Sequence, residues 1–119
     1  MIEIVNLITD LLSIPYVEED CPVFDWSFAI VPYMANGLSG NGIVQSTTTM
    51  LYAELFYADK TICVESALSL WKTIGTTKGM TAEAPDYTYE TSANLWRASI
   101  PIEIITKEDE WNADKCTGL

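Results

Sequence analysis

Carboxylate side chains are the residues of this 119-residue sequence best suited to chemistry. Asp25, Glu54, Asp86, Glu90 and Glu103 lie in or beside segments that alternate like β-strands. Two carboxyl groups that flank a glycosidic bond can hydrolyse it, so a carboxylate-dependent enzyme is one hypothesis. The spacing selects no pair, and charges on the solvent face of a sheet are the more ordinary interpretation. We therefore expect a protein that is not an enzyme.

The sequence offers few residues that are suited to other kinds of catalysis. There is no histidine, the most common general base and metal ligand. Serine and cysteine nucleophiles most often require such a base beside them. Cys21, Cys63 and Cys116 are widely spaced and form no Cys-x-x-Cys motif, so we expect reduced thiols, with Cys63 near the core. The Thr47–Thr49 run indicates β-propensity rather than a hydroxyl site.

Two short segments raise the question of a bound ion or nucleotide. Glu18, Glu19 and Asp20 are adjacent carboxylates that could help to hold a divalent cation, but they lack the alternating ligands of a calcium loop, so a solvated loop is expected. The segment 36–42 holds three glycines but not the lysine and hydroxyl of a phosphate-binding loop, and no helix follows it. We expect a turn or flexible loop there, and no metal or cofactor.

The excess of acidic residues restricts the classes of molecule that this chain can bind. Six basic and seventeen acidic residues give a net charge of −11, which repels nucleic-acid backbones and anionic membrane surfaces. The first residues lack the basic start and the continuous apolar run that are typical of a signal peptide, and no apolar run approaches the roughly 20 residues that a membrane span requires. We expect a product made in the cytoplasm that binds neither membranes nor specific nucleic-acid sequences.

The organising stretch is 44–74, which predicts a long strand, a tight turn and a helix. In the strand, Leu51 and its alternate neighbours make one face purely apolar or aromatic. Asp59 can cap the helix 60–74, and Gly75 follows as a stop. The expected apolar stripe of this helix has spacings of three and four. It consists of Val64, Ala67, Leu68, Trp71 and Ile74.

The remaining segments extend this unit. A helix is predicted over 2–13, a first strand over 24–33, a short strand over 86–90 and a better one over 94–105, with a polar loop at 76–85. Pro32 and Pro101 indicate edge strands or bulges, because proline cannot donate a ladder hydrogen bond. The fold class is therefore α+β, with an antiparallel sheet of about four strands and two packed helices. Residues 1–106 form a single domain, and 107–119 form a charged tail.

The order of these elements resembles the tail-terminator and tail-completion proteins of long-tailed bacteriophages. The resemblance rests on a starting helix followed by Ile14-Pro15-Tyr16-Val17, a strand 48–57 that passes directly into the helix 60–74, and the late strand 95–104. It covers the chain to about residue 105. The glycine-rich segment and the tail with Trp111 have no counterpart in it.

The resemblance implies a structural protein of the virion at the head–tail junction. Such proteins form a ring of identical subunits, commonly six, between tail-tube subunits and head-completion proteins. The central channel admits DNA, and an acidic lining would let DNA slide without sticking, which suits the net charge of −11. The alternative is a small acidic binding or regulatory module, such as an inhibitor that mimics nucleic acid.

The second face of the long strand carries Met50, Tyr52 and Phe56 around Glu54. We expect the three apolar residues at a subunit contact, because an apolar patch of this kind commonly marks an interface. The alternative is that the helix 2–13 covers them within one subunit. Trp111 either packs back on its own domain or joins this interface by anchoring the tail to a neighbouring subunit.

Overall fold

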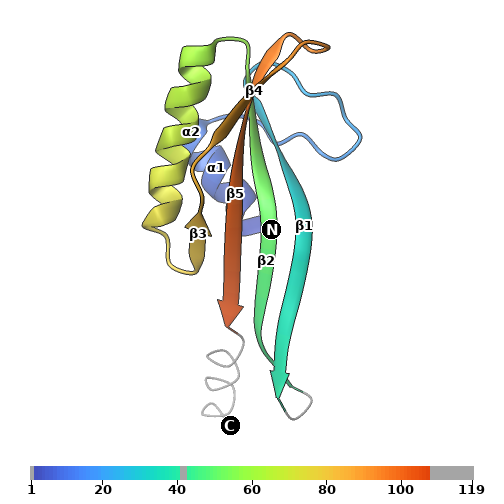
Figure 1. The fold of residues 1–119 in the computed structure, drawn as a ribbon, viewed down its shortest axis with the longest axis vertical. Helices are drawn as coiled ribbons and strands as arrows, with labels where there is room; N and C mark the ends of the chain where they lie inside the picture. The colour runs from blue at the N-terminus through green and yellow to red at the C-terminus, as the bar shows by residue number, and fades with distance from the viewer. Residues whose placement is uncertain (1, 41–42, 108–119) are drawn as a thin grey trace.

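The computed structural model describes residues 2–40 and 43–107. Five strands form one antiparallel sheet in the order β1-β2-β5-β3, and β4 also pairs with β5 (Figure 1). This arrangement confirms the predicted α+β class, with five strands in place of about four. The elements are α1 (Ile2–Leu12), β1 (Ser27–Gly40), β2 (Ile43–Tyr57), α2 (Lys60–Gly75), β3 (Met80–Ala82), β4 (Asp86–Glu90) and β5 (Leu95–Lys107).

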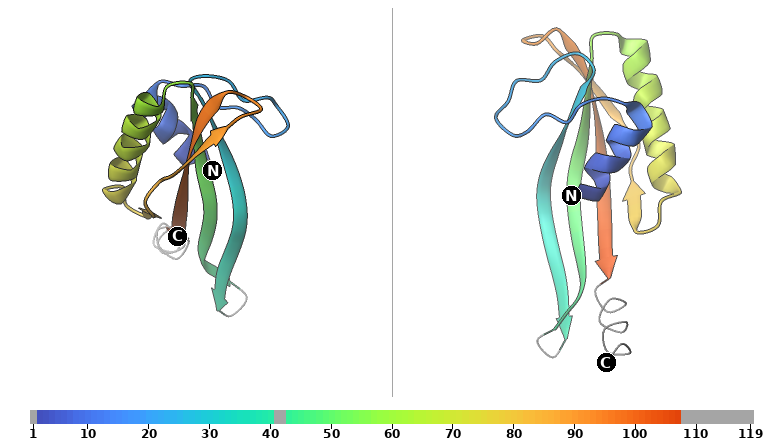
Figure 2. Two further views of the ribbon diagram at one scale, coloured as in Figure 1. Left: turned by 45° about the horizontal axis from the view of Figure 1, so that its top comes forward. Right: turned by 180° about the vertical axis from the view of Figure 1, so that it is seen from behind.

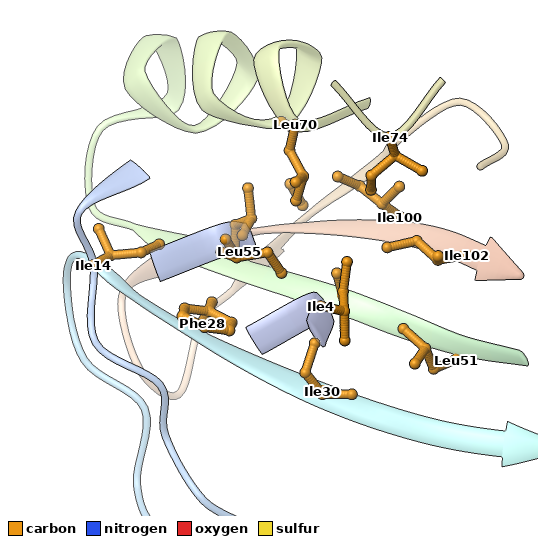
Figure 3. Close-up of a cluster of buried hydrophobic side chains, with 14 of the residues drawn as sticks. Ile4, Ile14, Phe28, Ile30, Leu51, Leu55, Leu70, Ile74, Ile100 and Ile102 are labelled. Atoms are coloured by element: carbon orange, nitrogen blue, oxygen red, sulfur yellow. The ribbon is translucent and has the colours of Figure 1, made fainter. Parts of the chain in front are cut away.

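Both helices pack on the same face of the sheet (Figure 2). The side chains between the two layers form one apolar cluster, in which Ile4 of α1 lies against the strands and Leu70 and Ile74 of α2 lie over β5 (Figure 3). The residues of β2 on the predicted apolar face are all buried. The residues of β5 that pair with them are also buried, except Trp96, which is half-buried. The described helices include none long and apolar enough to cross a membrane.

Helix α2 begins at the predicted residue and ends one residue later than predicted, at Gly75, and it presents a different stripe to the sheet. Asp59 caps it, its side chain accepting a hydrogen bond from the Ile62 N–H. The buried residues are Cys63, Ala67, Leu70 and Ile74. Ala67 and Ile74 are buried as predicted, but Leu68 is exposed and Val64 and Trp71 are only half-buried, so the stripe is displaced by part of a turn. The helix carries apolar residues on two adjacent stripes, and only the contact with the sheet selects between them.

The first strand begins later and runs further than predicted. The alternation over 24–33 predicts Phe24 and Trp26 on one face with Phe28, but both are exposed. The reason is that Trp26 has a φ of 64° and the Ser27 hydroxyl donates to the Phe24 carbonyl at 2.6 Å, which closes a turn before the strand begins. Beyond Tyr33, the predicted loop is wrong for residues 36–40, which pair with β2 as far as Gly40↔Ile43. Similarly, β3 lies within the segment that was expected to be a polar loop.

Of the two predictions for prolines in strands, one is confirmed and the other is wrong. Pro32 lies on β1, an edge strand, immediately before a bulge, as its residue type predicts. Pro101 lies in β5, which has β2 on one side and β3 and β4 on the other, so the predicted edge position is wrong. The Pro101 carbonyl accepts the Glu83 N–H at 3.0 Å, between β3 and β4. The missing N–H of Pro101 therefore faces the break between these two short strands.

Candidate functional site

The face of the sheet opposite the helices, which we call the open face, is the strongest candidate for a functional surface. The cross-strand pairs Val31↔Tyr52 and Met34↔Met50 place four of its apolar side chains on β1 and β2. The bulge between Pro32 and Met34 adds Tyr33 to the same face. The rings of Tyr33 and Tyr52 stack with centroids 4.7 Å apart and planes inclined by 27°.

The open face is exposed along β1 and covered at one end. Val31, Tyr33 and Met34 are 43–46% exposed, and Tyr52 is 36% exposed. Helix α1 lies on the other face, so the alternative that it covers these residues is wrong. Phe56, by contrast, is only 5% exposed. The chain returns to the sheet there, and the Trp26 N–H donates to the Phe56 carbonyl at 2.9 Å.

The predicted interface residues therefore divide into three groups. Met50 and Tyr52 lie together on the open face, Met50 half-buried and Tyr52 exposed. Phe56 belongs to the same face but is already packed within its own chain. Trp111 lies outside the described residues. The sequence interpretation missed Tyr33 and Met34, although the apolar run that continues past Pro32 was the signal that could have found them.

A shallow hollow of about 240 Å³ lies on the open face beside the tyrosine pair. Tyr33, Met50 and Pro101 line it together with the carboxylates of Glu83 and Glu103. Partial desolvation raises the pKa of Tyr33, and Tyr52, Glu83 and Glu103 raise it further. The phenol consequently stays protonated and is a hydrogen-bond donor rather than a nucleophile.

The candidate catalytic carboxylates are mostly engaged in structural contacts. Arg97 bridges Glu54 and Glu90, with N–O distances of 3.5 Å and 3.1 Å. Asp25 accepts the Ala58 N–H at 2.8 Å, and Asp86 accepts the N–H of the next residue. The structure thus brings Glu54 and Glu90 together around a cation, whereas Asp25 and Asp86 accept hydrogen bonds from backbone N–H groups.

The positions considered for metal or redox chemistry are dispersed. Glu18–Asp20 lie in an exposed turn, where the Cys21 N–H donates to the Glu18 carbonyl at 3.2 Å. Across residues 2–40 and 43–107, no three histidine, cysteine, aspartate or glutamate side chains gather as metal ligands. Cys63 is buried, and its burial raises the pKa of the thiol to about 11, while Cys21 is exposed. Cys116 lies outside the described residues.

Comparison with known protein families and with curated proteins finds no match to this chain.

Proposed function

We propose that this chain is a structural subunit of a bacteriophage virion, a tail-terminator or tail-completion protein that acts by forming a ring at the head–tail junction. The observation that carries the proposal is the exposed apolar and aromatic surface of Val31, Tyr33, Met34 and Tyr52 on the sheet face opposite the two helices. Methionine and aromatic side chains are enriched at the centre of specific protein interfaces. Contact between subunits through this face is therefore the expected mode of action.

The location of charge agrees with such a role. The open face carries Glu54, Glu83 and Glu103 around its apolar centre. A ring of subunits with a net charge of −11 each repels the phosphate backbone, so DNA passes through the channel without binding to it. Tail-tube subunits on one side and head-completion proteins on the other are the proposed partners. The site of action is the virion, after synthesis in the host cytoplasm.

The test is the solution mass of the full chain by light scattering over a range of concentrations, with the substitution Tyr52→Glu. We expect the parent to form a closed oligomer and Tyr52→Glu to remain a folded monomer. The reason is that the new carboxylate would be buried without a partner at the contact, while the free subunit leaves this position exposed. Circular dichroism should show little change in melting temperature.

Tyr89→Glu is the matched control, because Tyr89 is 42% exposed but lies on β4, away from the tyrosine pair. It should assemble like the parent. Normal assembly by Tyr52→Glu would contradict the proposed contact. A parent that stays monomeric at every concentration and binds basic proteins would instead favour the acidic nucleic-acid mimic.

A further inference from the structure

A second hollow, of about 320 Å³, lies where the loop between α1 and β1 meets the edge of the sheet. Its lining consists of residues 29–32 of β1 and of residues 17–21 and 23 of the loop. Figure 1 shows this loop beside β1, which is the last strand on its side of the sheet. The hollow therefore borders the main chain of an edge strand.

The main chain of β1 at Ile30 faces this hollow. The Phe28 N–H donates to the Pro15 carbonyl at 3.1 Å, and the Phe28 carbonyl accepts the Val17 N–H at 2.8 Å. The directions of N–H and C=O alternate along a strand, so those of Ile30 also point away from β2. The Ile30 side chain is only 8% exposed and lies in the core (Figure 3), so its main chain is the part that lines the hollow.

The segment 15–17 already pairs with this edge for the length of one bridge. Tyr16 and Phe28 form a parallel bridge, after which the chain turns away at Asp20, whose φ is 68°. Within residues 2–40 and 43–107, no segment pairs with this edge beyond Phe28. The edge thus accepts an extended segment at Phe28 and leaves the next outward position, Ile30, open.

We propose that an extended segment of another protein, rich in lysine or arginine, adds to this edge at Ile30 as a further strand. In this mode of recognition, main-chain hydrogen bonds give affinity and the side chains of the added segment give specificity. Pro32 is the next outward position, and it offers a carbonyl but no N–H. The ladder is therefore short, and side-chain contacts must decide which segment binds.

The charge of the hollow selects a basic segment. Glu18, Glu19 and Asp20 line it and are exposed, and the described residues of its lining include no lysine or arginine. Cationic side chains would meet these carboxylates, whereas an acidic segment would be repelled. A second copy that paired β1 with β1 would bring two sets of the same carboxylates to one contact. Electrostatic complementarity thus favours a different, basic partner.

The inference concerns the edge of β1 and does not depend on ring formation through the open face. The probe is the end-blocked peptide Lys-Val-Lys-Val-Lys-Val, added to the ¹⁵N-labelled full chain in about 0.15 M NaCl, which screens unspecific attraction. We expect hydrogen exchange of the Ile30 amide to slow about tenfold at saturation, because its N–H gains an acceptor. The Val31 amide faces β2 and should change little.

The first control is the same peptide methylated at every backbone nitrogen. It keeps the charge of the probe but cannot donate hydrogen bonds to a strand, so it should leave exchange at Ile30 unchanged. Equal slowing by both peptides would overturn the proposal, because charge alone would then explain binding. Unchanged exchange at Ile30 with the unmethylated peptide would also overturn it.

The second experiment tests the choice of a basic segment. The triple variant Glu18→Gln, Glu19→Gln and Asp20→Asn should bind the peptide about tenfold more weakly than the parent. Asparagine tolerates the positive φ of Asp20, so the turn is retained.

The matched control is the triple variant Glu3→Gln, Asp10→Asn and Glu65→Gln. It makes the same change of net charge at exposed helix positions that do not line the hollow, and it should bind like the parent. Equal affinity of the two triple variants would overturn the basic partner. Protection of Ile30 that rises with protein concentration in the absence of peptide would overturn it as well, because a second copy would then be the added strand.

Discussion

Burial raises the pKa of the Glu54 carboxyl, although Arg97 beside it acts to lower the pKa and Glu90 acts to raise it. Because the folded-state pKa is above the unfolded value, folding favours the protonated acid. This contribution to stability is complete below the unfolded pKa and is lost as the pH rises through the folded pKa. Glu54 therefore opposes folding when it is ionised near neutral pH, despite its ion pair.

We expect the ¹³C carboxyl titration of Glu54 to have a midpoint above the ordinary value for glutamate. The free energy of unfolding of the parent should fall relative to that of Glu54→Gln as the pH rises through this window. Glu65→Gln, at an exposed position of α2, controls for the loss of one negative charge. A midpoint at or below the ordinary value would show that Arg97 outweighs burial.

Gly79 and Gly75 respond differently to the same substitution. Gly79 combines a φ of 83° with a near contact to the Ile105 carbonyl, so Gly79→Ala should destabilise the fold by about 1–3 kcal/mol. Gly75 ends α2 with nothing within 4 Å of the added Cβ, so Gly75→Ala should stabilise by about 0.4–1 kcal/mol. Chemical denaturation measures both, and shifts in the same direction would contradict the assigned backbone geometry.

At the scale of elements, alanine substitutions of two leucines test which side of α2 faces the sheet. Leu70 is fully buried and Leu68 is 37% exposed. Leu70→Ala should cost about 2–5 kcal/mol of unfolding free energy, and Leu68→Ala about 0.5 kcal/mol or less. A larger loss for Leu68→Ala than for Leu70→Ala in urea denaturation would mean that the helix packs on the stripe expected from the sequence.

The long elements were predictable because their periodicity records burial directly. The alternation in β2 identified the buried face, and Asp59 marked the start of α2. The choice between two apolar stripes on α2 was not predictable, because it depends on where the sheet lies. The interior position of Pro101 was also hidden, since it depends on β3 and β4 ending on either side of it.

The candidate surface was predictable in part. The alternation of β2 placed Met50 and Tyr52 on the face away from the helices. The contribution of β1 was not visible, because a bulge after Pro32 changes which side chains share that face. The burial of Phe56 was equally hidden, because the alternation of β2 groups Phe56 with Tyr52 and does not distinguish a buried ring from an exposed one.

At the scale of the whole molecule, an apolar open face on a chain of net charge −11 makes a prediction about salt. Subunits of like charge repel one another, and added salt screens this repulsion while leaving apolar contacts intact. The proposed oligomer should therefore strengthen between about 0.02 and 0.15 M NaCl, as the Debye length falls to about 8 Å. Dissociation with added salt, measured by light scattering, would instead indicate contacts made mainly of ion pairs.

The β1–β2 hairpin extends beyond the end of the neighbouring strand β5. The pairing of β2 with β5 stops at Ser46↔Lys107, but β1 and β2 remain paired to Gly40↔Ile43 (Figure 1). A two-stranded ribbon has little stability of its own, so this end should fray without global unfolding. Amide hydrogens near Val44 should exchange much faster than those near Ala53, with little dependence on denaturant.

Fraying from one end means that the outer pairs of the hairpin open before the inner ones. A partner that binds the outer pairs should keep them paired, so that amide exchange there slows while the melting temperature of the domain stays nearly constant. Uniform protection from Val44 to Ala53 in the free chain would contradict this behaviour. Binding to the outer pairs, which end at Gly40↔Ile43, should thus change local opening and leave the core unaffected.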